Sequence, residues 1–305
     1  MSNFFKILFG SCLGTIVGLG VLFFLGISIF AGIAGSAEQK PTVSANSIMT
    51  LDLSVVPELT GNTPLDPGFG FNLELDMDEV LGLHYIVCTI EKAKEDDDIK
   101  GIYLNSMYQA GGFTKLRIIR EALTDFRSSG KFVLSYAPAY DQSAYYLASA
   151  GDEVYMGPLG AVDFRGFGAD IPFYKEMMDK VGVRFEVFYA GDFKSATEPY
   201  RRTNMSDENR LQTRQYLTAL WEYQIADVAE SRELSEAKVR SFANEVTGWK
   251  DQVAVDAGLV DGIKRRSEVD ERLHELVGFE EDKKLNKISI EKYFSAKMKK
   301  LRGGN

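Results

Sequence analysis

The fold class is decided by residues 99–136, which read IKGIYLNSMYQAGGFTKLRIIREALTDFRSSGKFVLSY. The apolar, β-branched run Ile99–Leu104 predicts a buried strand. Apolar residues at helical spacing then predict a helix near Thr114–Phe126, and Phe132–Tyr136 predicts a second strand. A strand, a helix and another strand in this order are typical of a largely parallel sheet.

The same alternation continues on both sides of this stretch. Ile48–Leu53 predicts the first strand, and Ser206 is expected to cap a long helix. The remaining predicted elements are helices over 142–150, 174–181, 206–230, 235–244 and 268–276, strands over 154–156 and 184–189, and a closing element over 252–263.

The chain is expected to contain one large domain with shorter flanking segments. These are an anchor at 1–37, a linker at 38–47, an α/β domain at 48–282 and a basic tail at 283–305. The tail is weakly amphipathic over Ile288–Arg302, which fits a surface helix, a membrane-facing patch or a linker cut short. The acidic run Asp96–Asp98 is expected to be a solvated turn.

The uncharged segment Ile7–Ala37 predicts a single transmembrane helix. It is rich in Leu, Ile, Phe and Gly, and a helix needs only roughly 20 apolar residues to cross the hydrocarbon. A cleavable signal peptide has a shorter apolar core of about 7–15 residues, although cleavage after Ala34 or Ala37 is an alternative. Because Lys6 precedes the segment and Glu38 follows it, we expect a cytoplasmic N-terminus and an extracytoplasmic domain.

Composition argues against two classes of function. The chain has two cysteines and two histidines, whereas a zinc site normally needs three or four such ligands, so we expect no metal and no other cofactor. Cys12 lies in the membrane segment and Cys88 in an apolar run, so no disulfide is expected. The formal net charge of −9 disfavours nucleic acid as a partner.

The chain has no convincing histidine for a Ser-His-Asp hydrolase. His84 lies on an apolar helix face, and His274 lies on a charged helix where we expect it to be exposed. A lysine can act as the base instead when burial favours its neutral amine. Lys194 is the candidate, because it lies in the turn-like segment GDFKSATEP after the predicted strand 184–189; the alternative is an ordinary surface lysine.

Residues 191–206, GDFKSATEPYRRTNMS, resemble the lysine motif of the signal peptide peptidase A family, also called protease IV. Other segments follow in the order expected of the N-terminal repeat of the family's long form, namely Ala110–Gly112, Ser129–Lys131, Tyr145–Ser149 and Gly166–Phe167. The resemblance covers nearly the whole chain. It implies a crotonase- and Clp-protease-like superhelix of ββα units and a membrane-anchored serine peptidase with a Ser-Lys dyad.

In the long form of this family the first repeat supplies the lysine and the second supplies the serine, so the resemblance implies that Lys194 is the general base and acid. The serine of an active repeat stands three residues before the aromatic pair that matches Tyr145-Tyr146, where this chain has Gln142. Ser143 is rotated from that direction by about 100° on a helix, and we do not expect it to replace the nucleophile. Gly111-Gly112 resemble an oxyanion loop, but a plain turn at the start of a helix is expected here.

The sequence leaves the roles of three neighbours of Lys194 open. Ser195, Glu198 and Arg201 could orient Lys194 or pair at a domain interface, and the sequence does not choose between these roles.

We expect the lysine-bearing half of a serine endopeptidase that degrades cleaved signal peptides and is inactive alone. Its expected location is the bacterial inner membrane, with the domain on the periplasmic side. Expected partners are extended apolar peptides, the lipid bilayer and further copies of the chain. The alternatives are a catalytically silent scaffold of a ring-shaped protease and a crotonase-type acyl-CoA enzyme, which the anchor opposes. The chain stops about where a second repeat would begin, so a truncated sequence is expected.

Overall fold

The computed structural model describes residues 14–15, 17–25, 41–53, 81–109, 111–245, 247–278 and 284–298. The chain divides into two units, residues 1–42 and 43–305. Residues 17–25 of the first unit are helical. Within the described residues, no helix is both long and apolar enough to span a bilayer. Most of the predicted anchor, Ile7–Ala37, lies outside them.

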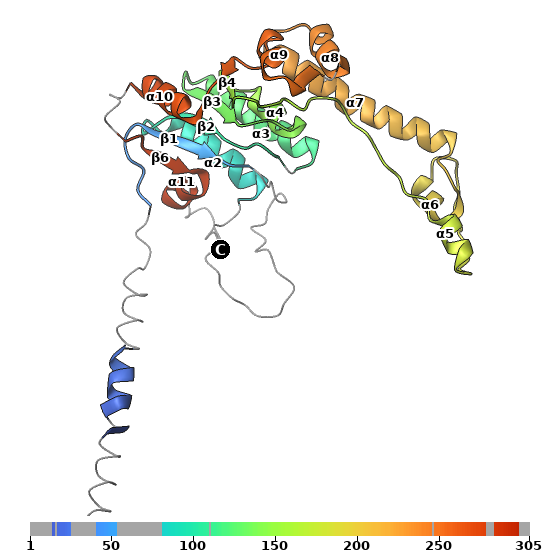
Figure 1. Cartoon of the computed structure of the whole chain (residues 1–305), viewed down its shortest axis with the longest axis horizontal. Coiled ribbons are helices and arrows are strands. Elements are labelled where there is room, and N and C mark those ends of the chain that lie inside the picture. The colour runs from blue at the N-terminus through green and yellow to red at the C-terminus, as the bar shows by residue number, and fades with distance from the viewer. Residues whose placement is uncertain are drawn as a thin grey trace, which may run out of the picture. The chain divides into compact units, whose positions relative to one another are not determined.

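Six strands of the described chain form one parallel sheet in the order β5-β4-β3-β2-β1-β6 (Figure 1). The strands are β1 (Ser47–Leu51), β2 (Ile99–Leu104), β3 (Phe132–Ala137), β4 (Glu153–Met156), β5 (Gly262–Ile263) and β6 (Lys287–Ser289). The first four follow the predicted runs closely, so the α/β class and the parallel sheet are confirmed. The more specific prediction of a crotonase-like superhelix stays a prediction.

The two faces of the sheet carry separate hydrophobic clusters. Ile102 and Leu104 of β2 lie in the larger cluster, whereas Tyr103 between them lies in the smaller one, as the two-residue period of a strand requires. The helices that pack on these faces are α2 (Leu83–Glu95), α3 (Phe113–Arg127) and α4 (Gln142–Ala148) on the larger cluster and α10 (Arg266–Val277) on the smaller one.

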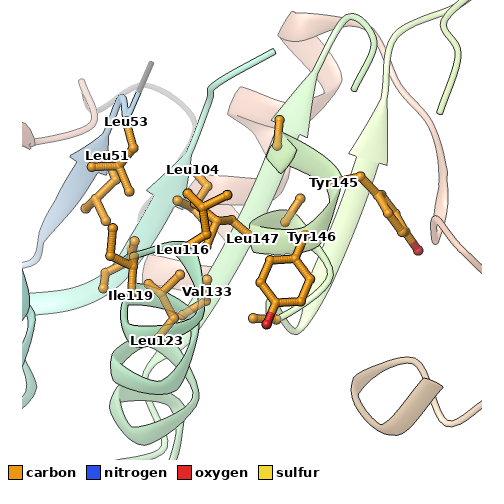
Figure 2. Close-up of a cluster of buried hydrophobic side chains, with 14 of the residues drawn as sticks. Leu51, Leu53, Leu104, Leu116, Ile119, Leu123, Val133, Tyr145, Tyr146 and Leu147 are labelled. Carbon is orange, nitrogen blue, oxygen red and sulfur yellow. The ribbon is translucent and has the colours of Figure 1, made fainter. Parts of the chain in front are cut away.

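Helix α3 shows how the larger cluster is built. Leu116, Ile119 and Leu123 recur at helical spacing and point toward the strands, where Leu104 and Val133 meet them (Figure 2). All five side chains are at most 5% exposed. Burying each such side chain contributes about 1.5–3 kcal/mol, so this face positions α3 and α4 firmly on the sheet.

A long excursion separates β4 from β5. We call residues 170–216 the arm; it contains α5 (Lys175–Lys180), η1 (Ser195–Thr197), α6 (Glu198–Arg201) and the first half of α7 (Asp207–Ser231). The buried side chains of the arm are all polar: Glu198, Ser206 and Asn209. In Figure 1, α5 and α6 lie at the far end of α7 from the sheet.

The second half of α7 belongs to the core of the sheet domain. Ile225 and Val228 are fully buried in the larger cluster. The elements that follow are α8 (Glu236–Glu245), η2 (Thr247–Trp249) and α9 (Asp251–Asp256), and they add Val239, Phe242 and Ala254 to the same cluster. One helix therefore joins the arm to the core.

The predicted strand 184–189 is wrong for this chain. Residues 183–190 have no regular secondary structure. Phe188 is 94% exposed, and Phe185 and Tyr189 are about half exposed. A strand needs a hydrogen-bonded neighbour, and no strand of the described chain pairs with this segment.

The predicted tail also differs from the expectation. Lys287–Ser289 forms β6 and pairs with β1, and Ile290–Lys297 forms α11. Tyr293 and Phe294 of α11 are buried in the core. The sheet domain therefore continues beyond residue 282, through at least Met298, which is 6% exposed.

The acidic turn Asp96–Asp98, which follows α2, provides contacts on which the basic helix α11 packs. Asp96 accepts a hydrogen bond from the Tyr293 hydroxyl at 2.9 Å and pairs with Lys297 at 3.1 Å. Burial alone would raise the pKa of Asp96, but hydrogen bonds from the Asp98 amide, Lys297 and Tyr293 lower it overall. The run Asp96–Asp98 is thus a docking point for α11, where only a solvated turn was predicted.

Candidate functional site

Lys194 lies in the arm, directly before η1. Gly191 takes φ +91°, a left-handed conformation that favours glycine, and the Lys194 N–H bonds to the Gly191 carbonyl at 3.4 Å to close the turn. The Lys194 side chain is exposed. Among the described residues, no hydrogen bond, ion pair or ring contact involves its amine. The turn therefore leaves the Lys194 side chain on the surface of the arm.

A buried carboxylate fixes the segment that follows Lys194. Glu198 is 0% exposed and accepts hydrogen bonds from Ser206 Oγ at 2.5 Å, Ser206 N at 3.1 Å and Asn209 Nδ2 at 2.8 Å. Burial would raise the pKa of Glu198, but these hydrogen bonds and the charge of Arg201 lower it overall. Glu198 thus joins α6 to the capped start of α7.

Arg201 adds further contacts to the same segment, and we call the contacts of Glu198 and Arg201 together the clamp. Its Nε donates to Thr197 Oγ1 at 3.1 Å, its Nη2 lies 3.6 Å from Glu198 Oε1, and its guanidinium lies 3.8 Å from the centre of the Tyr189 ring. Of the three neighbours whose roles were open, Glu198 and Arg201 hold the fold of the lysine segment. Ser195 starts η1 and is half-buried.

Gln142 begins α4, at the position where the resemblance predicts a missing serine. Its Oε1 accepts hydrogen bonds from the backbone N–H groups of Arg165 and Gly166 at 3.0 and 2.8 Å. Its Nε2 donates to Gln224 Oε1 on α7 at 3.0 Å. Both ends of the amide are therefore hydrogen-bonded. Gln142 links α4 to the second half of α7 and to the segment that leads into the arm, and we call this junction the base of the arm.

Helix α7 sets the separation between Lys194 and α4. Ser206 at its start contacts the lysine segment through Glu198, and Gln224 near its end contacts Gln142. The part between Ser206 and Gln224 is about 27 Å long, because an α-helix rises about 1.5 Å per residue. The lysine segment therefore lies at the opposite end of α7 from the contact with Gln142 (Figure 1).

The aromatic pair after Gln142 is part of the core. The Tyr145 hydroxyl donates to the Leu259 carbonyl at 2.8 Å, and the Tyr146 hydroxyl donates to Asp227 Oδ2 at 2.5 Å. Burial raises the pKa of both hydroxyls, and for Tyr146 the bond to Asp227 adds to this rise. Both side chains are fully buried, so they position α4 and are not available to a substrate.

The other predicted groups lie elsewhere. Gly112 is the N-cap of α3, and its carbonyl accepts from the N–H groups of Lys115 and Leu116, which is the plain turn expected there. His84 is exposed, and His274 is half-buried rather than exposed as predicted. In the described part of the chain, no group of three or more His, Cys, Asp or Glu side chains is placed to hold a metal ion.

The sequence profile of Peptidase family S49 matches residues 125–280, about half of the chain, including Gln142 and Lys194. The chain belongs to Peptidase family S49. Protease 4 of Haemophilus influenzae is 33% identical over 218 residues, which cover 69% of this chain and 35% of that protein. Protease 4 of Salmonella typhi is 30% identical over 271 residues, covering 85% and 43%.

A plant relative and a solved structure extend the comparison. The chloroplastic serine protease SPPA of Arabidopsis thaliana is 29% identical over 206 residues, covering 68% of this chain and 30% of that protein. This S49 chain thus spans less than half the length of the relatives it matches. An enoyl-CoA hydratase structure from Geobacillus kaustophilus has a TM-score of 0.35 at 14% identity over 63% of this chain and 62% of that one. That similarity is too low to assign a fold.

Two features of the site could not be predicted from the motif alone. The contact between Gln142 and Gln224 joins residues far apart in the sequence, and no local pattern marks it. The clamp around Glu198 has a partial signal, because the sequence predicts Ser206 as the cap of α7, and Ser206 Oγ accepts from the Asn209 N–H at 3.1 Å. No local pattern predicts that Glu198 is the buried acceptor of the Ser206 hydroxyl.

Proposed function

We propose that this S49 chain is the lysine-bearing part of a serine endopeptidase that cleaves apolar peptides, among them released signal peptides, at a bacterial inner membrane. Lys194 is the general base and acid. The serine nucleophile comes from another part of the complete protein or from another chain. One observation carries the proposal: the lysine segment is held at the start of α7 on the exposed arm, whereas Gln142, at the expected nucleophile position, contacts α7 about 27 Å of helix further along.

The mechanism requires a neutral amine at Lys194. Its Nζ takes the proton of the serine hydroxyl while the serine oxygen bonds to the peptide carbonyl carbon. The resulting ammonium protonates the amide nitrogen as the C–N bond breaks. Lys194 then deprotonates a water molecule, which hydrolyses the acyl-enzyme and restores the serine. Because burial favours the neutral form of a lysine, a surface that covers the arm would also activate Lys194.

The arm supplies the surface for such a partner. Phe188 is 94% exposed, and Phe185, Tyr189 and Phe193 are each about half exposed. A contiguous exposed apolar surface is typical of an interaction site. The unpaired segment 183–190 can also form strand hydrogen bonds with another chain. We therefore propose that the arm packs on a serine-bearing segment in an assembly that includes further copies of this chain.

The test uses the assembled enzyme, made by combining this chain with a serine-bearing segment from an S49 relative or from its own extended coding sequence. Hydrolysis of a fluorogenic apolar peptide is measured for Lys194→Ala and for Lys180→Ala, an exposed lysine of α5 on the same arm. Loss of a general base lowers the rate by roughly 10²–10⁴-fold, so Lys194→Ala should be nearly inactive and Lys180→Ala should be active. Equal rates for the two variants would instead favour a catalytically silent scaffold.

A further inference from the structure

A pocket of 440 Å³ lies between α7 and the irregular segment 165–169 that leads into the arm. We call it the arginine pocket. The residues that define it are Arg165, Phe167, Arg210, Arg214, Leu217 and Trp221. Its volume lies within the range of roughly 300–1,000 Å³ that is typical of ligand sites.

Helix α7 contributes a charged end and an apolar end to this pocket. Arg210 and Arg214 are one turn apart on the same helix face, and Leu217 and Trp221 continue that face toward the core. The Trp221 ring is held in place, with its centre 5.0 Å from that of Phe164 and 6.4 Å from that of Phe167. A ligand that fits both ends has an anionic group joined to an apolar body.

The charge of the pocket is one-sided. No Asp or Glu lines it, although the chain has a formal net charge of −9. Arg165 is already paired with Asp163, its Nη2 donating to Oδ2 at 2.7 Å. Among the described residues, neither Arg210 nor Arg214 has an ion-pair partner. Two guanidinium groups one helical turn apart therefore have their donors available for a carboxylate, which arginine binds in a bidentate manner.

The wall opposite α7 is held rigidly. The N–H groups of Arg165 and Gly166 both donate to Gln142 Oε1, which fixes the backbone of this wall on α4. Gly166 takes φ +103° and lies over the Trp221 ring, so that a Cβ there would come within 3.8 Å of it. Because this wall is already fixed, less conformational entropy is lost when a ligand binds.

We propose that the arginine pocket binds the carboxyl-terminal end of an apolar peptide. The terminal carboxylate pairs with Arg210 and Arg214, and the last apolar side chains pack on Leu217 and Trp221. This inference rests on the proposed peptidase function, because each peptide cleavage creates a new carboxyl terminus on an apolar fragment. The pocket then holds the new carboxyl terminus against α7, at a site separate from the peptide bond that is cleaved.

The test measures direct binding of short leucine- and alanine-rich peptides to the chain by calorimetry. Three peptides are compared: one with a free carboxyl terminus, the same peptide amidated, and an amidated peptide with one internal glutamate. The free acid should bind at least roughly tenfold more tightly than both amides, because it alone offers a terminal carboxylate for charge-assisted hydrogen bonds from the two arginines. Arg214→Gln and Arg210→Gln should each abolish this preference, whereas Lys238→Gln on α8 should keep it.

Equal binding of acid and amide, absence of binding, or an unchanged preference in Arg214→Gln and Arg210→Gln would each overturn the inference. Tight binding of the glutamate peptide would also overturn it, because the pocket would then bind side-chain carboxylates and would not be specific for a carboxyl terminus. Circular dichroism establishes that the variants are folded. The measurement involves no hydrolysis, so Lys194→Ala should bind the free acid like the native chain. Failure of the pocket is therefore distinguishable from failure of Lys194 as the base.

Discussion

Gln142 on α4 and Gln224 on α7 are joined side chain to side chain at 3.0 Å. Gln224 is 1% exposed, and the other end of the Gln142 amide holds the backbone of Arg165 and Gly166. Gln142 thus attaches the base of the arm to α4.

Gln142→Ala should destabilise the junction between α4 and α7. The substitution leaves Gln224 and two backbone N–H groups without their partner, so the free energy of unfolding should fall by about 2 kcal/mol. Urea denaturation measures this change. The control is Gln212→Ala on the exposed part of α7, which should stay within about 0.5 kcal/mol of the native chain. Equal losses in the two variants would contradict the assigned role.

Glu198 should make the stability of the lysine segment depend on pH. Its pKa lies below the ordinary value of 4.5, so its stabilising contribution is complete above that value and is lost as pH falls through the lower folded-state pKa. Hydrogen exchange at the start of α7 should therefore accelerate in acid beyond the intrinsic pH dependence of exchange.

Glu198→Gln provides the check, because it should remove that additional acid dependence. Glu271→Gln, at an exposed position of α10, should keep it. If Glu198→Gln retained the full pH dependence, another group would be responsible for it.

Arg120 should be the most sensitive charged residue of the core. It is 4% exposed, and its guanidinium donates to the carbonyls of Tyr146 and Asp227 and to the hydroxyls of Ser149 and Ser231. These bonds link α3, α4 and α7. Arg120→Met should lower the free energy of unfolding by about 3 kcal/mol, because it leaves buried acceptors unpaired.

The matched variant is Arg117→Met on the same helix. Arg117 is 38% exposed in its side chain and pairs with Glu121 at 3.4 Å, so its loss should cost less than about 1 kcal/mol. Arg120→Lys should not rescue stability, since one ammonium cannot reach four acceptors on two helices. Thermal unfolding gives the ranking directly, and a larger loss for Arg117→Met than for Arg120→Met would contradict it.

Phe188 should contribute to self-association. It is 94% exposed on the unpaired segment of the arm, and Phe188→Ser removes its apolar area from any interface. Sedimentation velocity should show weaker assembly for this variant. Leu159→Ser is the control, because Leu159 is 95% exposed but lies outside the arm. Equal effects of the two substitutions would show that general surface hydrophobicity, and not the arm, drives association.

The sheet could be predicted from the sequence because its strands are continuous apolar runs between turn residues. The prediction of a strand at 184–189 was wrong because a strand needs a hydrogen-bonded neighbour, and none of the strands in the described part of the chain pairs with it. The prediction for the tail was wrong for a different reason: Asp96 contacts Tyr293, which lies 197 residues later in the sequence, and no local pattern predicts such a contact.

The site was predictable only in part. Lys194 was singled out by its position and motif, but the distance from α4 depends on the length and direction of α7. The clamp on Glu198 and the junction at Gln142 are both tertiary contacts. The arginine pocket had a readable signal, since Arg210, Arg214, Leu217 and Trp221 recur at helical spacing.

The central claim is that this chain provides the lysine of a dyad but not the serine. Covalent labelling of the isolated chain with a fluorophosphonate tests it most directly. We predict no labelling of the native chain, and none after Gln142→Ser, because α7 holds the lysine segment at its end opposite to α4. Labelling of the native chain that disappears with Ser143→Ala would contradict the account.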